Sequence, residues 1–180
     1  MRRHFLRRCL LLTAGFSAGV MHPLRALASA YKEINWEELI PKEWRKQVIF
    51  QLALMRRFAN AEDGDPKAKE AYAKLKKTWD SAPIEKSMIG KKVRIPGYVV
   101  PLDAERMQSR NFLIVPYFGA CVHTPAPPAN QIIMIIPPKG TLTRTMDAIW
   151  VEGVLGEERT FSEAGTSAYV IKAEKVTPYR

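Results

Sequence analysis

The spacing of apolar residues changes once along the chain, and the first part has helical spacing. Apolar residues recur three and four positions apart in two stripes, Trp44, Val48, Ile49, Leu52, Met55 and Phe58, then Ala68, Tyr72, Leu75 and Trp79. Residues at this spacing share one face of a helix. Pro41 suits the start of the first helix, and Asp65 and Pro66 suit the cap and first turn of the second. The pattern of apolar residues and helix-start signals therefore predicts two helices within residues 31–82.

From Ile89 onward, apolar and polar residues alternate with the period of a β-strand. Five such segments follow one another, KKVRIPGYVVPLD, FLIVPYF, NQIIMIIPPKG, AIWVEGVLG and SAYVIKAEKV. Gly97 and Gly153 lie inside two of them, where glycine often marks a bulge or a sharp bend. We expect an α+β fold in which the helical pair packs on a five-stranded, OB-like antiparallel β-barrel over residues 89–180. A small sandwich or an open meander is the alternative.

Residues 1–30 have the pattern of a cleaved signal peptide. Basic residues precede an apolar run from Cys9 to Met21, and the small residues Ala28-Ser29-Ala30 follow as a cleavage site. The apolar run is too short to span a bilayer. The segment RRHFLR is similar to a twin-arginine export signal, and an ordinary secretory signal is the alternative. We expect a periplasmic protein that does not span the membrane after cleavage, with residues 31–180 as one domain.

The charge balance of residues 31–180 differs from that of the whole chain. The full sequence has a formal net charge of +10, whereas residues 31–180 hold 23 Lys and Arg against 18 Asp and Glu, a net charge of +5. A mild excess of this size is not typical of proteins that bind nucleic acid. No nucleic-acid partner is therefore expected.

Cys121 and His123 are the only cysteine and histidine after residue 30, and both lie in YFGACVHTPAPPANQ, residues 117–131. Thiolate and imidazole are ligands of zinc and copper, and two residues two positions apart in an extended segment point to the same side. The pair is a candidate zinc or copper site. A closed zinc site needs three or four protein ligands, so further donors or a second subunit would be required.

The same stretch admits two other functional interpretations. A histidine beside a cysteine can activate the thiol, with Asn130 and Gln131 as polar partners, so a thiol-dependent periplasmic enzyme is one hypothesis. The other is a surface that docks an envelope or transporter protein. Its candidate residues are Tyr117, Phe118, Pro125, Pro127, Pro128, Asn130 and Gln131, because a proline-rich run favours the polyproline II conformation used in recognition. The remaining alternative is that this stretch is only a structural turn, stiffened by its prolines, in which Cys121 is a small buried side chain.

Three segments carry a family resemblance. INWEELIP (34–41), VRIPGYVVPLD (93–103) and FLIVPYFGACVHTPAPPANQ (112–131) resemble the bacterial exported proteins grouped as domain of unknown function 3299. The resemblance implies a periplasmic or lipid-anchored protein, sometimes encoded near membrane transport systems, and no established reaction. Unlike lipid-anchored relatives, this chain has no lipobox. The resulting hypothesis is a non-enzymatic accessory or binding protein of the envelope that is associated with transport.

Overall fold

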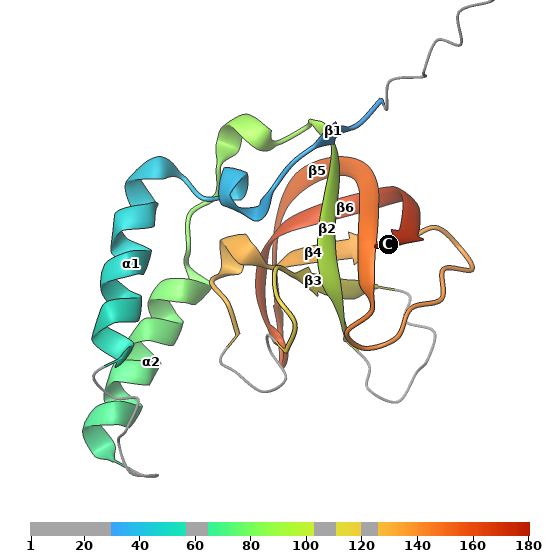
Figure 1. Ribbon diagram of the computed structural model, residues 1–180. Helices are drawn as coiled ribbons and strands as arrows, with labels where there is room; N and C mark the ends of the chain where they lie inside the picture. The colour runs from blue at the N-terminus through green and yellow to red at the C-terminus, as the bar shows by residue number, and fades with distance from the viewer. Residues whose placement is uncertain (1–29, 57–64, 103–110, 120–125) are drawn as a thin grey trace, which may run out of the picture.

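The computed structural model describes residues 30–56, 65–102, 111–119 and 126–180. Two helices and a six-stranded mixed sheet make an α+β fold, with both helices on one side of the sheet (Figure 1). The helices are α1 (Lys42–Arg56) and α2 (Pro66–Asp80), and the short 3-10 helices are η1 (Trp36–Leu39), η2 (Lys86–Met88) and η3 (Ala129–Gln131). The strands are β1 (Lys32–Glu33), β2 (Lys92–Pro101), β3 (Phe112–Val115), β4 (Ile133–Ile136), β5 (Ala148–Ser162) and β6 (Gly165–Pro178).

The two predicted helices are confirmed, as is the start of the second at Asp65 and Pro66, and the first begins just after Pro41. The carboxylate of Asp65 accepts hydrogen bonds from the backbone N–H groups of Lys67 at 2.8 Å and Ala68 at 3.4 Å. The predicted stripes are buried only in part. Trp44 in α1 is buried, whereas Ile49 is 69% exposed and Tyr72 in α2 is 43% exposed. Among the side chains that the structure describes, each predicted stripe is therefore buried along a narrower strip than the sequence pattern indicates, and Phe58 of the first stripe lies outside the described residues.

Replacing Asp65 by alanine is expected to lower the free energy of unfolding by about 1 kcal/mol, because two N–H groups of the first turn of α2 lose their acceptor. Urea denaturation followed by circular dichroism measures this change. Asp65→Asn keeps an acceptor oxygen and is the matched control, so it should retain most of the stability. Equal losses in both variants would contradict a capping role.

The strand pairings close into a ring. The order is β1-β2-β3-β4-β6-β5, and β2 pairs with β5 as well. A ring of five strands cannot alternate in direction throughout, since five is an odd number, and β4 and β6 form the parallel pair. The five predicted strands are present, but the expectation of five purely antiparallel strands is wrong in two respects. The sheet is mixed, and the short strand β1 adds a sixth member parallel to β2.

The two strand glycines serve different purposes. The register of β5 against β6 shifts between Glu152 and Gly153, which confirms a bulge there. A Cβ atom at Gly153 would lie 2.4 Å from the carbonyl oxygen of Lys172. Gly97 instead pairs with β5 in regular register, and a Cβ there would lie 3.0 Å from Ile114 and 3.2 Å from the Trp36 ring. Gly97 is therefore a point of close packing rather than a bend.

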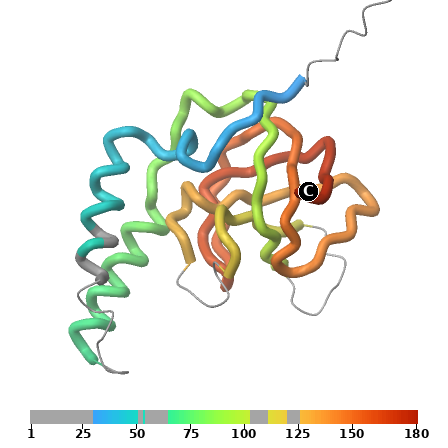
Figure 2. The backbone as a smooth tube through the Cα atoms, viewed as in Figure 1, coloured from blue at the N-terminus to red at the C-terminus, as the bar shows by residue number. Residues whose placement is uncertain are grey.

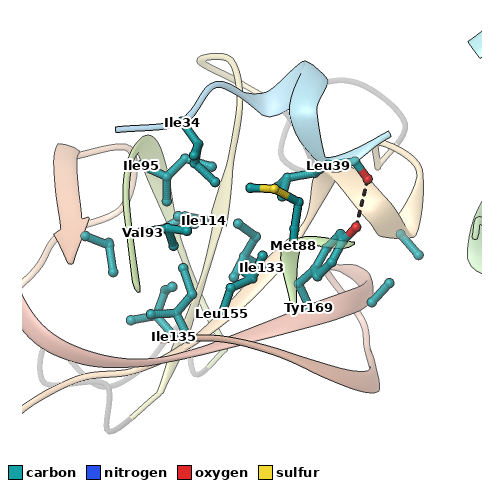
Figure 3. Close-up of a cluster of buried hydrophobic side chains, with 14 of the residues drawn as sticks. Ile34, Leu39, Met88, Val93, Ile95, Ile114, Ile133, Ile135, Leu155 and Tyr169 are labelled. Carbon is teal, nitrogen blue, oxygen red and sulfur yellow. Dashed lines mark hydrogen bonds between the residues drawn. The ribbon is translucent and has the colours of Figure 1, made fainter. Parts of the chain in front are cut away.

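The main hydrophobic core lies inside the ring of strands and extends to the N-terminal segment (Figure 3). Val93, Ile95 and Val99 alternate on the inner face of β2, as their spacing predicts, and all three are buried. The buried Tyr169 hydroxyl donates to the carbonyl of Leu39 at 2.8 Å (Figure 3) and accepts from the backbone N–H of Glu85 at 2.6 Å. Tyr169 thus joins β6 to the segments on either side of the helical pair.

A second cluster of buried side chains brings together residues of β2, β3, β4 and β6, with Ile132 just before β4. Its members are Val100, Leu113, Val115, Ile132, Met134 and Val170. In β3 all four residues are buried, so neighbouring side chains of this strand pack on both faces of the sheet. Within the described parts of the chain, no helix has the length and apolar character needed to cross a membrane.

Candidate binding groove

A small groove lies on the outer face of the sheet, where β2 pairs with β5. It has a volume of about 180 Å³ and is lined by Trp36, Pro96, Gly97, Tyr98, Pro116, Ala148 and Tyr179. Pro96 and Tyr98 point outward because they alternate with the core residues of β2. Aromatic rings, prolines and small residues form the whole of this lining, and we call it the aromatic groove.

The indole of Trp36 is held in place at the groove by polar contacts. Its Nε1 donates to the carbonyl oxygen of Pro96 at 2.7 Å. The η1 helix that carries Trp36 begins with a capping box, in which the side chain of Asn35 accepts from the N–H of Glu38 and the side chain of Glu38 accepts from the N–H of Asn35. A hydrogen bond from Lys32 to Glu38, at 2.6 Å, lowers the pKa of that carboxyl. Gly97 leaves the space that the indole ring occupies.

Further aromatic rings extend the groove on both sides. The ring of Tyr98 lies 5.8 Å from that of Phe118 in an edge-on arrangement, and the ring of Trp150 lies 5.1 Å from that of Tyr179. Phe118 is 68% exposed. Trp150 pairs in register with Pro96, one strand away. With Trp36, five rings therefore gather on one outer surface, and the edge-on pair of Tyr98 and Phe118 has a geometry that aromatic rings favour.

A charged group borders this surface at Trp150. The guanidinium of Arg94 lies over the Trp150 ring, 4.0 Å from its centre. Its nitrogens also pair with the carboxylates of Glu33 at 3.1 Å and Glu152 at 3.4 Å. A cation over the ring face is attracted by the negative π-face, and the two carboxylates balance its charge. Arg94 thus holds the indole of Trp150 in position.

The two aromatic residues predicted at the site are exposed, whereas Asn130 and two of the prolines are buried and Gln131 is half-buried. Tyr117 is 47% exposed and Phe118 adjoins the aromatic groove through Tyr98. Pro127 and Pro128 are buried, so the expectation of an exposed proline run is wrong for these two residues. The run leads into η3, which packs on β6, and Pro127 lies beside Leu75 and Trp79 of α2.

Asn130 and Gln131 bind backbone groups of other segments. The side-chain amide of Asn130, which is fully buried, donates to the carbonyl of Pro83 at 2.8 Å. That of Gln131 donates to the carbonyl of Trp36 at 2.9 Å. Gln131 therefore ties η3 to the residue whose indole lines the aromatic groove.

Cys121, His123 and Pro125 lie outside the described residues, so a zinc or copper site there stays a prediction. Among the residues that the structure does describe, no group of three or more His, Cys, Asp or Glu side chains is arranged to hold a metal ion.

A larger cavity of about 530 Å³ lies between α2 and the turn that joins β5 to β6. Its apolar walls include Leu75 and Trp79 of α2, Pro127, and Ala164 of the turn. Lys76 and Thr166 both bind the carboxylate of Asp80 beside it, at 2.6 Å and 2.8 Å. These polar neighbours are therefore engaged with one another, whereas the aromatic groove has the exposed ring of Tyr179 in its lining and that of Phe118 beside it.

The sequence reasoning missed most of the aromatic groove, namely Trp36, Pro96, Tyr98, Trp150 and Tyr179. A signal for three of them was present. Pro96 and Tyr98 alternate with core residues in β2, and Trp150 lies between two core residues of β5. Large rings on the outward positions of neighbouring strands indicate a surface that binds something rather than one that only faces water.

The comparisons with known proteins agree on one family. The sequence model of a family described as "Protein of unknown function (DUF3299)" matches residues 36–178. A crystal structure of a DUF3299 family protein from Pseudomonas aeruginosa PAO1 is 31% identical, with a TM-score of 0.58, and the match covers 83% of this chain and 97% of that chain. No curated protein matches the chain.

A second crystal structure, of a Leishmania major Friedlin protein assigned as an aspartyl-tRNA synthetase, is 14% identical with a TM-score of 0.34. The match covers 52% of this chain and 18% of that chain. A likeness this low supports no conclusion about fold or function.

Proposed function

The chain belongs to the DUF3299 family, and on that premise we propose that it is a non-enzymatic binding protein of the bacterial envelope. In this proposal the aromatic groove holds an extended, proline-containing segment of a partner protein. The observation that supports it is the gathering of five aromatic rings on one outer surface, with Phe118 68% exposed. Export to the periplasm rests on the signal-like residues 1–30.

The chemistry of the lining favours an extended segment with proline. Flat rings offer faces on which a proline ring can stack, and a polyproline II segment loses little conformational entropy when it binds. A volume of about 180 Å³ accommodates one or two small side chains at a time. The neighbouring rings of Phe118 and Trp150 then provide contacts for the residues before and after. Such a surface binds by stacking and burial rather than by proton transfer.

The ring of pairings also supports an OB-like interpretation of the β section. Such barrels place their ligands on the outer faces of neighbouring strands and on the adjoining loops. The aromatic groove occupies a comparable place, with β2 and β5 as its floor and Pro116, just after β3, at its margin. The fold alone does not choose the ligand, so the proposal depends on the side chains.

A fluorescein-labelled decaproline peptide is the probe that tests this function. Fluorescence polarisation is expected to show saturable binding to the purified protein. Phe118→Ala should weaken binding about tenfold, equivalent to about 1.4 kcal/mol, because one exposed ring face is lost. Trp150→Ala should weaken it by a similar factor.

Phe161→Ala is the matched control, since Phe161 is 72% exposed but lies near the end of β5, outside the aromatic groove. Its affinity for the peptide should equal that of the unaltered protein. Absence of saturable binding, or equal losses in Phe118→Ala and Phe161→Ala, would argue against the groove as the binding site.

A further inference from the structure

The helical pair accounts for the net positive charge of residues 31–180. The α1 helix has four basic residues and one acidic residue, and α2 has five basic and two acidic residues, a net charge of +6 for the two. Residues 31–180 as a whole have a net charge of +5, so the remainder of that region sums to −1. The two helices pack against each other and stand to one side of the sheet (Figures 1 and 2). Charge is therefore segregated onto a projecting part of the molecule.

The α1 helix also exposes large apolar side chains beside its basic residues. Ile49 is 69% exposed and Phe50 is 71% exposed. Both follow the exposed Lys46 by three and four positions, a spacing that places them on the same side of a helix. Trp44, on another side of α1, is buried in the main core and anchors the helix to the protein. Burial in the core thus orients α1 with Ile49 and Phe50 outward.

We propose that α1 is a membrane-surface helix that docks the protein on an anionic phospholipid bilayer. In this arrangement Ile49 and Phe50 enter the boundary between headgroups and acyl chains. Lys46 and the other exposed lysines of the helical pair lie near the lipid phosphates. A helix with apolar side chains on one side, basic residues around them and a length of 15 residues suits the interface rather than a transmembrane span.

The distribution of charge favours a lipid surface over an acidic protein partner. The exposed lysines are spread along both helices, Lys42 and Lys46 in α1 and Lys67, Lys69, Lys74, Lys76 and Lys77 in α2. A bilayer containing anionic lipid presents diffuse negative charge over a wide area, which matches such a spread. An acidic protein site would instead be met by a few basic groups at fixed positions.

Vesicle co-sedimentation of the purified protein tests the proposal. Vesicles of phosphatidylcholine with roughly 30 per cent phosphatidylglycerol should bind the protein, and vesicles of phosphatidylcholine alone should bind it at least about tenfold more weakly. Raising the salt to about 0.5 M should release most of the protein, because the charges are screened. Binding that is equal on both vesicle types, or no binding, would overturn the proposal.

Two variants distinguish vesicle binding through α1 from non-specific adsorption of exposed apolar side chains. The double variant Ile49→Ser, Phe50→Ser is expected to lower vesicle binding about tenfold, since it removes the apolar side chains that enter the interface. Leu142→Ser is the matched control, because Leu142 is 70% exposed in the loop before β5, and it should bind as the unaltered protein does. Circular dichroism checks that α1 stays helical in each variant.

An acidic protein is the competing partner, and it predicts a different experimental result. If the helical pair recognises an acidic protein, soluble polyglutamate should bind the protein tightly while phosphatidylglycerol vesicles do not, and this would overturn the membrane proposal. Equal loss of vesicle binding in the Leu142→Ser control would also overturn it. The decaproline assay uses a different surface, so either proposal can fail without the other.

Discussion

Replacing Gly153 by alanine is expected to lower the free energy of unfolding by about 3 kcal/mol, a large effect for a single methyl group. The added Cβ would lie 2.4 Å from the carbonyl oxygen of Lys172 and 2.6 Å from Cγ2 of Ile171. The carbonyl belongs to the backbone of β6, which pairs with β5 on both sides of the bulge, so it cannot rotate away. The strands must separate locally to admit the methyl group.

Gly156→Ala is the matched control for Gly153→Ala. Its Cβ would lie 2.9 Å from Cγ1 of Val170, a side-chain atom that a change of rotamer can move. We expect a loss of about 1 kcal/mol in that variant. Urea denaturation of both proteins gives the comparison, and equal stabilities of the two variants would contradict the account of the bulge.

Tyr169→Phe is expected to have the second large effect, a loss of about 3 kcal/mol. The hydroxyl that donates to Leu39 and accepts from Glu85 would be absent, leaving a buried carbonyl and a half-buried N–H without partners. Urea denaturation measures the change. Tyr72→Phe is the control, since Tyr72 is 43% exposed and water can replace its contacts, and it should be nearly neutral.

Tyr169 also predicts how stability depends on pH in the alkaline range. Burial raises the pKa of the Tyr169 hydroxyl from 10.0 to about 12. The folded protein therefore favours the protonated hydroxyl, and this contribution is complete below pH 10 and is lost as the pH rises through 12. Tyr169→Phe lacks that titration, so its stability should fall less steeply over this range. Identical slopes in both proteins would show that Tyr169 does not titrate in this way.

Local periodicity was sufficient to predict most elements of the fold. The alternation around Val93 and Ile95 is produced by a strand with one face in the core, and the signal at Asp65 and Pro66 marks the start of α2. The strand β1 has only two residues, too few to show a period. The parallel pairing of β4 with β6 depends on which strands become neighbours in the folded protein. The local sequence pattern of a strand does not indicate its neighbours.

Of the rings at the candidate site, the sequence indicated only the one that lies in the stretch of residues 117–131. Phe118 was anticipated as a docking residue because it lies in the same stretch as the proline-rich run. The other rings come from residues 36, 98, 150 and 179, which only the strand pairings and η1 bring together. The burial of Pro127 and Asn130 was not anticipated, since proline and asparagine are mostly exposed in proteins. Here Asn130 belongs to η3, which packs on β6, and Pro127 lies beside α2.

The central claim, that the aromatic groove binds an extended proline-containing segment, is tested most directly by locating a bound peptide. Two-dimensional NMR of the ¹⁵N-labelled protein, titrated with unlabelled decaproline, reports which amide and indole N–H groups change their environment. We predict that the changes gather around Trp36, Tyr98, Phe118 and Trp150 and that Phe118→Ala reduces them at the same peptide concentrations. Changes confined to other parts of the molecule, or no changes at millimolar peptide, would contradict the claim.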